Sequence, residues 1–320
     1  MADPIITLDD VRVHFPETHG LHKQFLRAVD GVSLDVFPGE TVGLVGEAGC
    51  GKSTLGRAIA DLIPVTDGRV LYHGADIRTL KGADKRLYRK NVQMVFQDPA
   101  ASLNPRLRVR QIVGEPLQSG VTLTREECRE RVESIVATVG LPVDALDRYP
   151  HEFSGGQQQR IGIARSLVLH PEFIVCDEAV SALDVSVQAQ ILNLLQQLKE
   201  EYRLTYLFIS HNLSVVRHMC DRIAVMYLGR IVELGSAQQI FDNPLHPYTR
   251  ALISAIPIAG ERRREGRIVL TGDLPSPTDV IEGCAFCNRC YERCEGCDTQ
   301  SPTLREVETG HFVRCFGQEK

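Results

Sequence analysis

A glycine-rich segment, TVGLVGEAGCGKST at 41–54, carries the clearest spacing for chemistry in this chain. The apolar run at 42–45 is typical of a buried strand. Apolar residues then recur at helical spacing, at Leu55, Ile59, Leu62 and Ile63. Glycines let backbone N–H groups turn inward at a helix N-terminus, where the helix dipole favours an anion. The pattern GxxxxGK[ST], placed between strand and helix, therefore predicts a loop that binds the phosphates of a nucleotide.

Side chains of this loop have roles that follow from their chemistry. Lys52 is expected to reach the β and γ phosphates, and the Ser53 hydroxyl can ligate Mg²⁺. The residues expected to contact the nucleotide are Gly46, Gly49, Cys50, Gly51, Lys52, Ser53 and Thr54. Cys50 is interpreted as a small loop residue, with a redox-sensitive thiol as the alternative. A glycine-rich turn without a function fits the full pattern less well.

Two carboxylates follow a second apolar run, in EFIVCDEAVSALD at 172–184. Parallel strands present their chemistry at their C-terminal ends, so we expect Asp177 to ligate Mg²⁺. Glu178 is then placed to orient or deprotonate an attacking water. A helix cap is the alternative interpretation of this pair. A third strand, TYLFIS, precedes His211, which either contacts a γ-phosphate or is structural.

A second predicted helix N-terminus lies in FSGGQQQR at 153–160. It presents the backbone amides of SGGQ, which is Ser154, Gly155, Gly156 and Gln157. Such a terminus also suits a phosphate, although it is distant in sequence from the first loop. Because one nucleotide does not need two such loops, the sequence raises the question of a second nucleotide.

Taken together, these motifs resemble the ATP-binding cassette (ABC) ATPases. The phosphate loop, FQD with Gln97, SGGQ, IVCDE, SALD with Asp184, and His211 occur in that family's order and spacing, over nearly all of the first 240 residues. The resemblance implies an α/β fold: a P-loop NTPase (RecA-like) core with an antiparallel β subdomain, a helical subdomain and a small Cys-rich C-terminal extension. It also implies that SGGQ faces the ATP of a partner subunit in a head-to-tail dimer.

A narrower resemblance is to the ATPase subunits of oligopeptide and dipeptide importers, more to the second of their two paired ATPases. It rests on FQDPAASLNPRLRV, VSALDVSVQAQILNLL, HPYT (246–249) and LPSP (274–277). Three motifs depart from the usual pattern: DEAV for DEPV, SGGQQQR for SGGQRQR at Gln158, and HNL for HDL. The implied partners are a paired ATPase in a heterodimer, two membrane permease subunits and, indirectly, an external solute-binding protein. The implied location is peripheral, on the cytoplasmic face of the cell membrane.

The resemblance also assigns further roles and boundaries. Gln97 is expected to act in catalysis and as a Mg²⁺ ligand, and the adenine to stack on Phe15, with Phe25 as the alternative. The ABC ATPase domain is expected at 5–240, with its helical subdomain at about 99–163, and the transporter C-terminal domain at 241–320. Residues 109–117 are expected either to meet the permease or to pack internally.

Two functions without transport remain as alternatives. One is a soluble ABC ATPase acting as a mechanical or repair protein, which usually carries coiled-coil or zinc insertions that the segment between phosphate loop and SGGQ lacks. The other is a component of a phosphonate-processing complex. Co-purification with membrane permease subunits would separate these functions from transport.

Bulk composition narrows the function classes further. A formal net charge of −5 and a pI near 6.1 argue against nucleic-acid binding, and the basic run at 261–267 is interpreted as a solvated linker. No apolar run reaches the roughly 18 residues of a membrane span, and the N-terminal residues lack a signal-peptide pattern, so we expect a cytosolic chain. The ten cysteines should then be reduced or bound to metal.

The segment GCAFCNRCYERCEGC at 283–297 contains several metal-ligand spacings. Cys284, Cys287, Cys290 and Cys294 match a ferredoxin run, although Glu295 stands where proline normally follows. Cys284, Cys287, Cys294 and Cys297 form two C-x₂-C pairs, a zinc pattern with a short spacer. A third set, Cys284, Cys290, Cys297 and Cys315, is similar to that of the peptide-importer ATPases. We favour this third set with a [4Fe–4S] cluster, with Zn²⁺ or unliganded cysteines as alternatives.

Overall fold

The computed structural model describes most of the 320-residue chain. The described residues are 3–19, 22–119, 123–256, 267–272, 275–276, 278–279 and 281–318. Leu274 and Pro277 of the LPSP motif lie outside them, as does the basic run except for Arg267.

A central sheet of eight strands crosses the molecule in the order β11-β12-β10-β9-β3-β8-β7-β6. Its strands are β3 (Thr41–Val45), β6 (Val92–Val95), β7 (Phe173–Asp177), β8 (Thr205–Ile209), β9 (Arg222–Tyr227), β10 (Arg230–Ser236), β11 (Arg305–Glu308) and β12 (His311–Val313). The strands from β9 to β6 are parallel, and β3, β7 and β8 are buried along their whole length. Burial on both faces explains why these strands are continuous apolar runs rather than alternating patterns.

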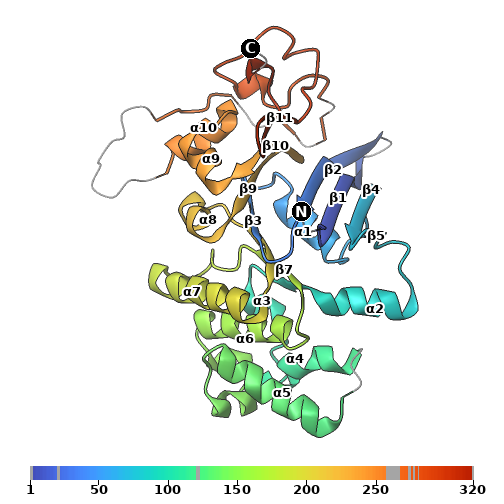
Figure 1. The fold of residues 1–320 in the computed structure, drawn as a ribbon, viewed down its shortest axis with the longest axis vertical. Helices are drawn as coiled ribbons and strands as arrows, with labels where there is room; N and C mark the ends of the chain where they lie inside the picture. Colours follow the sequence, from blue (N-terminus) through green and yellow to red (C-terminus); the bar gives the residue numbers. More distant parts are fainter. Residues whose placement is uncertain are drawn as a thin grey trace.

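A second sheet of four strands, in the order β2-β1-β4-β5, is antiparallel. Its strands are β1 (Ile6–His19), β2 (His22–Val36), β4 (Asp67–Tyr72) and β5 (Ala75–Asp76). It lies beside the central sheet (Figure 1). Glu172, which directly precedes β7, links the two sheets. Its carboxylate accepts a hydrogen bond of 2.9 Å from Tyr72 Oη, at the end of β4, and lies 3.0 Å from His73 Nε2.

Some helices pack around the central sheet, and others form a separate group at one end of the molecule (Figure 1). They are α1 (Lys52–Ile59), α2 (Gly82–Asn91), α3 (Pro99–Ser102), α4 (Val109–Gly114), α5 (Arg125–Thr138), α6 (Gly155–Leu167), α7 (Val185–Tyr202), α8 (Leu213–Met219), α9 (Ala237–Asp242) and α10 (Pro247–Ser254). Short 3₁₀ helices are Glu115–Ser119, Val143–Asp147, Pro150–Glu152, Cys287–Arg289 and Phe316–Gln318. Helix α1 ends earlier than its apolar spacing predicts: Asp61 has a positive φ of 57°, and Leu62 is 53% exposed.

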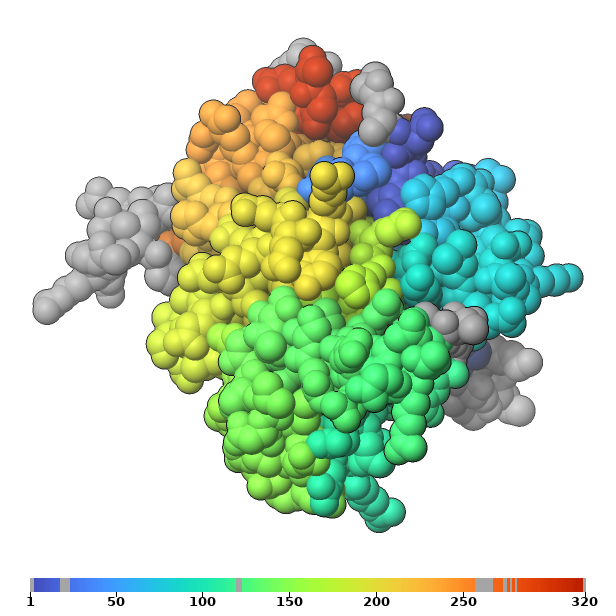
Figure 2. Space-filling model, turned by 60° about the horizontal axis from the view of Figure 1, so that its bottom comes forward, coloured from blue at the N-terminus to red at the C-terminus, as the bar shows by residue number. Residues whose placement is uncertain are grey.

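Helices α4, α5 and α6 lie at the end of the molecule opposite the C-terminal segment, which is the chain from residue 241 onward (Figure 1). Figure 2 shows this helical part, in green, as a distinct lobe next to the rest of the molecule. The apolar residues of 109–117, namely Val109, Ile112, Val113 and Leu117, are almost fully buried in it. These four side chains therefore pack internally, which is the second of the two expectations for this range.

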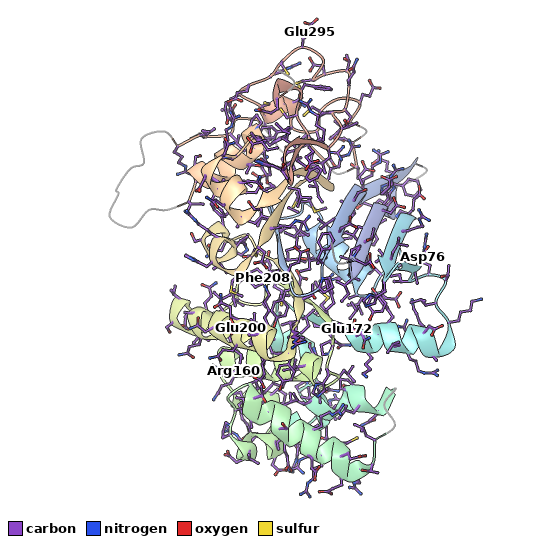
Figure 3. All side chains as sticks on the ribbon, in the orientation of Figure 1. Asp76, Arg160, Glu172, Glu200, Phe208 and Glu295 are labelled. Atoms are coloured by element: carbon purple, nitrogen blue, oxygen red, sulfur yellow. The ribbon has the colours of Figure 1, made fainter. Side chains whose placement is uncertain are left out.

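The C-terminal segment is joined to the central sheet by its last strands. Strand β12 pairs with β10, so the hairpin β11–β12 extends the central sheet. His311 Nε2 lies 2.8 Å from Glu233 Oε1, and both side chains are fully buried. Figure 3 shows the span of the molecule, from Arg160 in the helical part through Phe208 in the central sheet to Glu295 near the C-terminus. Among the described residues, no helix is both long and apolar enough to cross a membrane.

Candidate nucleotide site

A cavity of about 700 Å³ lies at the end of β3, above the phosphate loop. Its lining includes Phe15, Leu26, Ala28, Ala48, Gly49, Gly51, Lys52, Ser53, Thr54, Gln97, Glu178 and His211. The structure therefore brings residues from five separate motifs to one space. Phe15 lines the cavity and is 37% exposed, whereas Phe25, the alternative, does not line it and is 51% exposed. No local pattern in the sequence pointed to Leu26 or Ala28, whereas Ala48 belongs to the phosphate loop.

The loop itself wraps closely around Lys52. The Lys52 ammonium donates hydrogen bonds of 2.9 Å to the carbonyl oxygens of Gly46 and Glu47, and it is 4% exposed. Cys50 lies beside it, with Sγ 3.7 Å from Nζ, but it is buried and does not line the cavity. Burial raises the pKa of the Cys50 thiol, which disfavours a reactive thiolate.

At two positions of the loop only glycine fits, because another part of the backbone lies too close for a side chain. Gly51 has φ +102°, and a Cβ there would lie 1.9 Å from the Ala28 carbonyl oxygen. Gly46 has φ +152°, and its Cβ would lie 2.1 Å from the Met226 carbonyl oxygen. No L side chain fits at such distances, so the spacing of these glycines follows from packing as well as from loop conformation.

Ser53 and Asp177 form the part of the site that fits a divalent cation. The Ser53 hydroxyl donates to Asp177 Oδ1 at 2.6 Å, which joins the start of α1 to the end of β7. Among the described residues, Asp177 Oδ2 is buried and finds no hydrogen-bond partner. Burial raises the pKa of Asp177, and the Ser53 hydroxyl opposes that rise. A buried carboxylate oxygen without a partner beside a hydroxyl is a donor set that suits Mg²⁺.

Glu178, Gln97 and His211 meet at the mouth of the same cavity. Gln97 Nε2 donates to Glu178 Oε2 at 2.9 Å, and His211 Nδ1 lies 3.4 Å from Glu178 Oε1. Glu178 has a positive φ of 45°, a backbone conformation that costs energy for a residue other than glycine. The structure thus brings these three side chains together, with the Gln97 amide directed at Glu178.

The SGGQ segment lies outside this cavity. Ser154 caps α6, accepting a hydrogen bond from the Gln157 amide, and the Gln157 side chain accepts one from the Ser154 amide. Ser154, Gly155 and Gln157 are exposed, while Gly156 packs so closely on α7 that its Cβ would lie 2.3 Å from Val187 Cγ1. None of these residues lines the cavity at the phosphate loop.

Two departures from the usual motifs leave the local structure intact. Gln158 Nε2 donates to the carbonyl oxygens of Pro150 at 2.9 Å and Phe153 at 3.2 Å, which holds the turn before SGGQ. Asn212 caps α8 by accepting from the Ser214 amide at 3.1 Å. An amide side chain therefore provides the contacts needed at both positions.

The cysteine-rich segment shows no assembled metal site. Within the described ranges, no three or more His, Cys, Asp or Glu side chains form a group that could hold a metal ion. The Sγ atoms of Cys294 and Cys297 lie 3.3 Å apart, and the Cys287 thiol donates to Asp298 Oδ1 at 3.3 Å. The geometry therefore does not support the predicted [4Fe–4S] cluster.

Comparison with known proteins gives two family matches. Residues 29–181 match the ABC transporter family, and residues 232–297 match the C-terminal region of oligopeptide/dipeptide transporters. Two solved structures share the fold, each with a TM-score of 0.64. One is cbiO1 from Clostridium perfringens, at 26% identity, covering 75% of this chain and 92% of that one. The other is a dimeric ATP-binding cassette with ADP and Pi, at 28% identity, covering 72% and 98%. The predicted fold class is thereby confirmed.

Curated relatives match over nearly the whole chain. The oligopeptide transport ATP-binding protein AppF of Bacillus subtilis is 52% identical, covering 98% of this chain and 97% of the relative. OppF of Escherichia coli, with the same description, is 49% identical, covering 98% and 96%. Identity at this level over nearly the whole chain confirms the resemblance found in the motifs. It also confirms that the chain is an ATPase. The chain belongs to the oligopeptide transport ATP-binding proteins of the ABC transporter family.

Proposed function

We propose that this chain is the ATPase subunit that energises peptide uptake by an ABC importer, through membrane permease subunits. The observation that carries the proposal is the meeting of Gln97, Glu178 and His211 beside Lys52 in one cavity. The relatives' names add the transport role. A soluble ATPase without a transport role, such as a phosphonate-processing component, is not favoured, because full-length relatives are described as transport proteins.

Each side chain of the cavity has a proposed part in hydrolysis. Lys52 and the loop amides bind the phosphates, and Phe15 stacks on the adenine. Ser53, Asp177 and Gln97 would hold Mg²⁺, which when bound neutralises charge on the phosphate oxygens. Glu178 polarises the attacking water, while Gln97 and His211 hold the Glu178 carboxylate in place. His211 also faces the γ-phosphate.

The position of SGGQ supports a dimer with two shared nucleotides. Because Ser154, Gly155 and Gln157 are exposed and lie outside the cavity of their own chain, we infer that they contact the ATP of a paired ATPase. A solved relative of the fold is itself a dimer. The paired subunit is proposed to be a different chain, and ATP between the two subunits closes the dimer.

A groove next to the nucleotide cavity supports coupling to a permease. It has a volume of about 950 Å³ and runs between the core and the helical part, lined among others by Phe96, Gln97, Asp98, Pro116 and Arg165. Gln97 lines both this groove and the nucleotide cavity. A permease segment in the groove would therefore contact the residue that orients Glu178. We place the chain peripherally on the cytoplasmic face of the membrane, with an external solute-binding protein as an indirect partner.

We also propose domain boundaries and a metal site for this chain. We propose an ATPase domain at 5–240, with the helical subdomain at about 99–163, and a C-terminal domain at 241–320. A [4Fe–4S] cluster on Cys284, Cys290, Cys297 and Cys315, with Zn²⁺ as the alternative, is tested by iron and zinc content after anaerobic purification. Colourless protein with one tightly held zinc would contradict the cluster. Loss of metal in Cys287→Ser but not in Cys315→Ser would contradict the ligand set.

The transport role is tested with the genes for the permease pair and the paired ATPase co-expressed with this chain. We expect all four chains to purify together in detergent and, in vesicles with the binding protein, to accumulate a labelled peptide when ATP is present. The chain alone should hydrolyse ATP poorly and gain activity with the paired ATPase. Full activity of this chain as a strict monomer, or no co-purification with the permease pair, would contradict the proposal.

A further inference from the structure

The phosphate loop is held from outside the ATPase motifs, by the C-terminal segment. Arg289, in the 3₁₀ turn Cys287–Arg289, donates two hydrogen bonds to the Glu47 carboxylate, from Nη1 at 2.7 Å and from Nη2 at 3.0 Å. Glu47 is the second residue of the loop GEAGCGKS and does not line the nucleotide cavity. Its side chain therefore faces the C-terminal segment rather than the ligand.

A second contact reaches the same loop residue. The Glu47 backbone amide donates to Tyr248 Oη at 2.8 Å, and Tyr248 belongs to α10 in the HPYT motif. Both the main chain and the side chain of Glu47 are thus fixed by residues more than 200 positions further on, in the last third of the chain. This loop residue has little freedom while the C-terminal segment is folded.

An aromatic cluster makes this attachment rigid. Tyr227, Tyr248 and Phe286 pack edge to face or tilted, with ring centroids 4.7 to 5.4 Å apart. All three side chains are buried, and Phe286 comes from the cysteine-rich segment itself. The Arg289 side chain is only 11% exposed, against 31% for Glu47. A bidentate, largely buried arginine–carboxylate pair of this kind is geometrically specific and costly to break from one side.

Glu47 also connects this contact to the residue that binds phosphate. Its carbonyl oxygen accepts a hydrogen bond from Lys52 Nζ at 2.9 Å. A shift of Glu47 would move one of the acceptors that orient the Lys52 ammonium. In addition, a Glu47 carboxylate without its cation would place a negative charge in a loop whose ligand is a polyanion. Both effects would weaken nucleotide binding.

We propose that Arg289 is a positioning residue for ATP, which fixes the phosphate loop through Glu47 and makes nucleotide affinity depend on the fold of the cysteine-rich segment. The inference rests on ATP binding at the loop. Arg289 does not line the nucleotide cavity, and its contact with the phosphate loop is the Glu47 carboxylate, while its Nη1 also lies 3.5 Å from Tyr227 Oη. This role of Arg289 does not depend on whether the neighbouring cysteines bind a metal.

The test compares variants of the full chain, assayed with its paired ATPase. Arg289→Met should raise the KM for ATP and the Kd of a fluorescent ATP analogue by about tenfold, leaving kcat within about twofold, since one buried charge pair is removed. Arg289→Lys keeps the charge and loses the two-pronged geometry, and should give an increase of about threefold. Glu47→Gln combined with Arg289→Met should recover much of the lost affinity, because the uncompensated carboxylate is gone.

Arg293→Met is the matched control. Arg293 lies in the same segment and pairs with Asp298 rather than with Glu47. It should leave KM and Kd unchanged. A purely structural role for Arg289 would lower the melting temperature without changing KM, and would overturn the proposal, as would an equal effect of Arg293→Met. If Arg289→Met does not fold, an unchanged KM in Arg289→Lys overturns it. A wild-type chain that binds no ATP analogue would instead contradict the proposed function.

Discussion

The phosphate loop and the cysteine-rich segment are both dense in residues that could do chemistry, yet they are organised differently. The loop lies between a buried strand, β3, and a helix, α1, and these two elements determine where its side chains point. The segment at 283–297 has only the 3₁₀ turn Cys287–Arg289, and contacts with the core fix its shape. A motif that carries its own strand and helix predicts geometry, whereas a motif made of turns does not.

The two regions also differ in how far their residues converge. At the phosphate loop, the Gln97–Glu178–His211 group lines one cavity together with Ser53, and the Ser53 hydroxyl donates to the buried Asp177 carboxylate. In the cysteine-rich segment, thiols are close in sequence, but among the described residues they form no metal-holding group. Spacing along a chain is therefore a weaker guide where no regular element converts it into direction.

The largest effect is expected from Glu178, which tests the convergence at the nucleotide site. Glu178→Gln keeps the hydrogen bond to Gln97 possible but removes the charge that polarises water. Hydrolysis, measured as phosphate release with the paired ATPase, should fall about 10²- to 10⁴-fold while binding of an ATP analogue is retained. Glu200→Gln, an exposed change on α7, is the control and should have no effect. Near-normal hydrolysis by Glu178→Gln would remove Glu178 from the mechanism.

A second prediction tests whether packing fixes the cysteine-rich segment. Phe286 is 1% exposed and contacts Tyr227 and Tyr248. Phe286→Ala should cost about 3–5 kcal/mol of stability, because it leaves a cavity between the segment and the core. Denaturant unfolding and proteolysis of the C-terminal region would measure this loss. Tyr291→Ala removes a side chain that is 45% exposed and should cost much less. Equal effects of the two changes would show that the cluster does not anchor the segment.

The third prediction concerns pH and the helix that joins the two regions. Burial lowers the pKa of His246 to about 4, and its Nδ1 accepts a hydrogen bond from the Tyr248 amide at 3.1 Å. The unfolded chain binds the proton at the ordinary pKa of 6.5, so stability is full above pH 6.5 and is lost as pH falls toward 4. The loss should reach roughly 3 kcal/mol.

Unfolding free energies measured from pH 7 to pH 4 would test this. His246→Asn keeps an acceptor for the Tyr248 amide and should flatten the pH dependence, because Asn does not titrate. His218→Asn, at an exposed position of α8, is the matched control and should leave the slope as in the wild type. An unchanged slope in His246→Asn would show that this histidine does not set the acid sensitivity of the junction.

The smallest effect is expected from the adenine contact, the least constrained part of the nucleotide site. Phe15 lines the cavity, so Phe15→Ala should weaken binding of an ATP analogue by roughly 1 kcal/mol, or about fivefold. Phe25→Ala is the matched comparison and should change binding little, since Phe25 does not line the cavity. A larger effect at Phe25 than at Phe15 would reverse this assignment.

The sequence by itself determined the ATPase core and most of its site. Buried parallel strands are continuous apolar runs, and their C-terminal ends are where Asp177 and Glu178 had to lie. The glycine spacing required a tight loop before α1. Local patterns of this kind are decided by backbone geometry and solvent exclusion, which act over a few residues.

Tertiary structure alone decided the rest. The burial of Val109 and Ile112 shows that apolar residues of the helical part pack inward, and the pairing of β12 with β10 places the C-terminal end in the central sheet. The contact between Arg289 and Glu47 joins residues 242 positions apart. No local pattern encodes such pairs, because the partners meet only after the chain has folded and each alone is an ordinary charged residue.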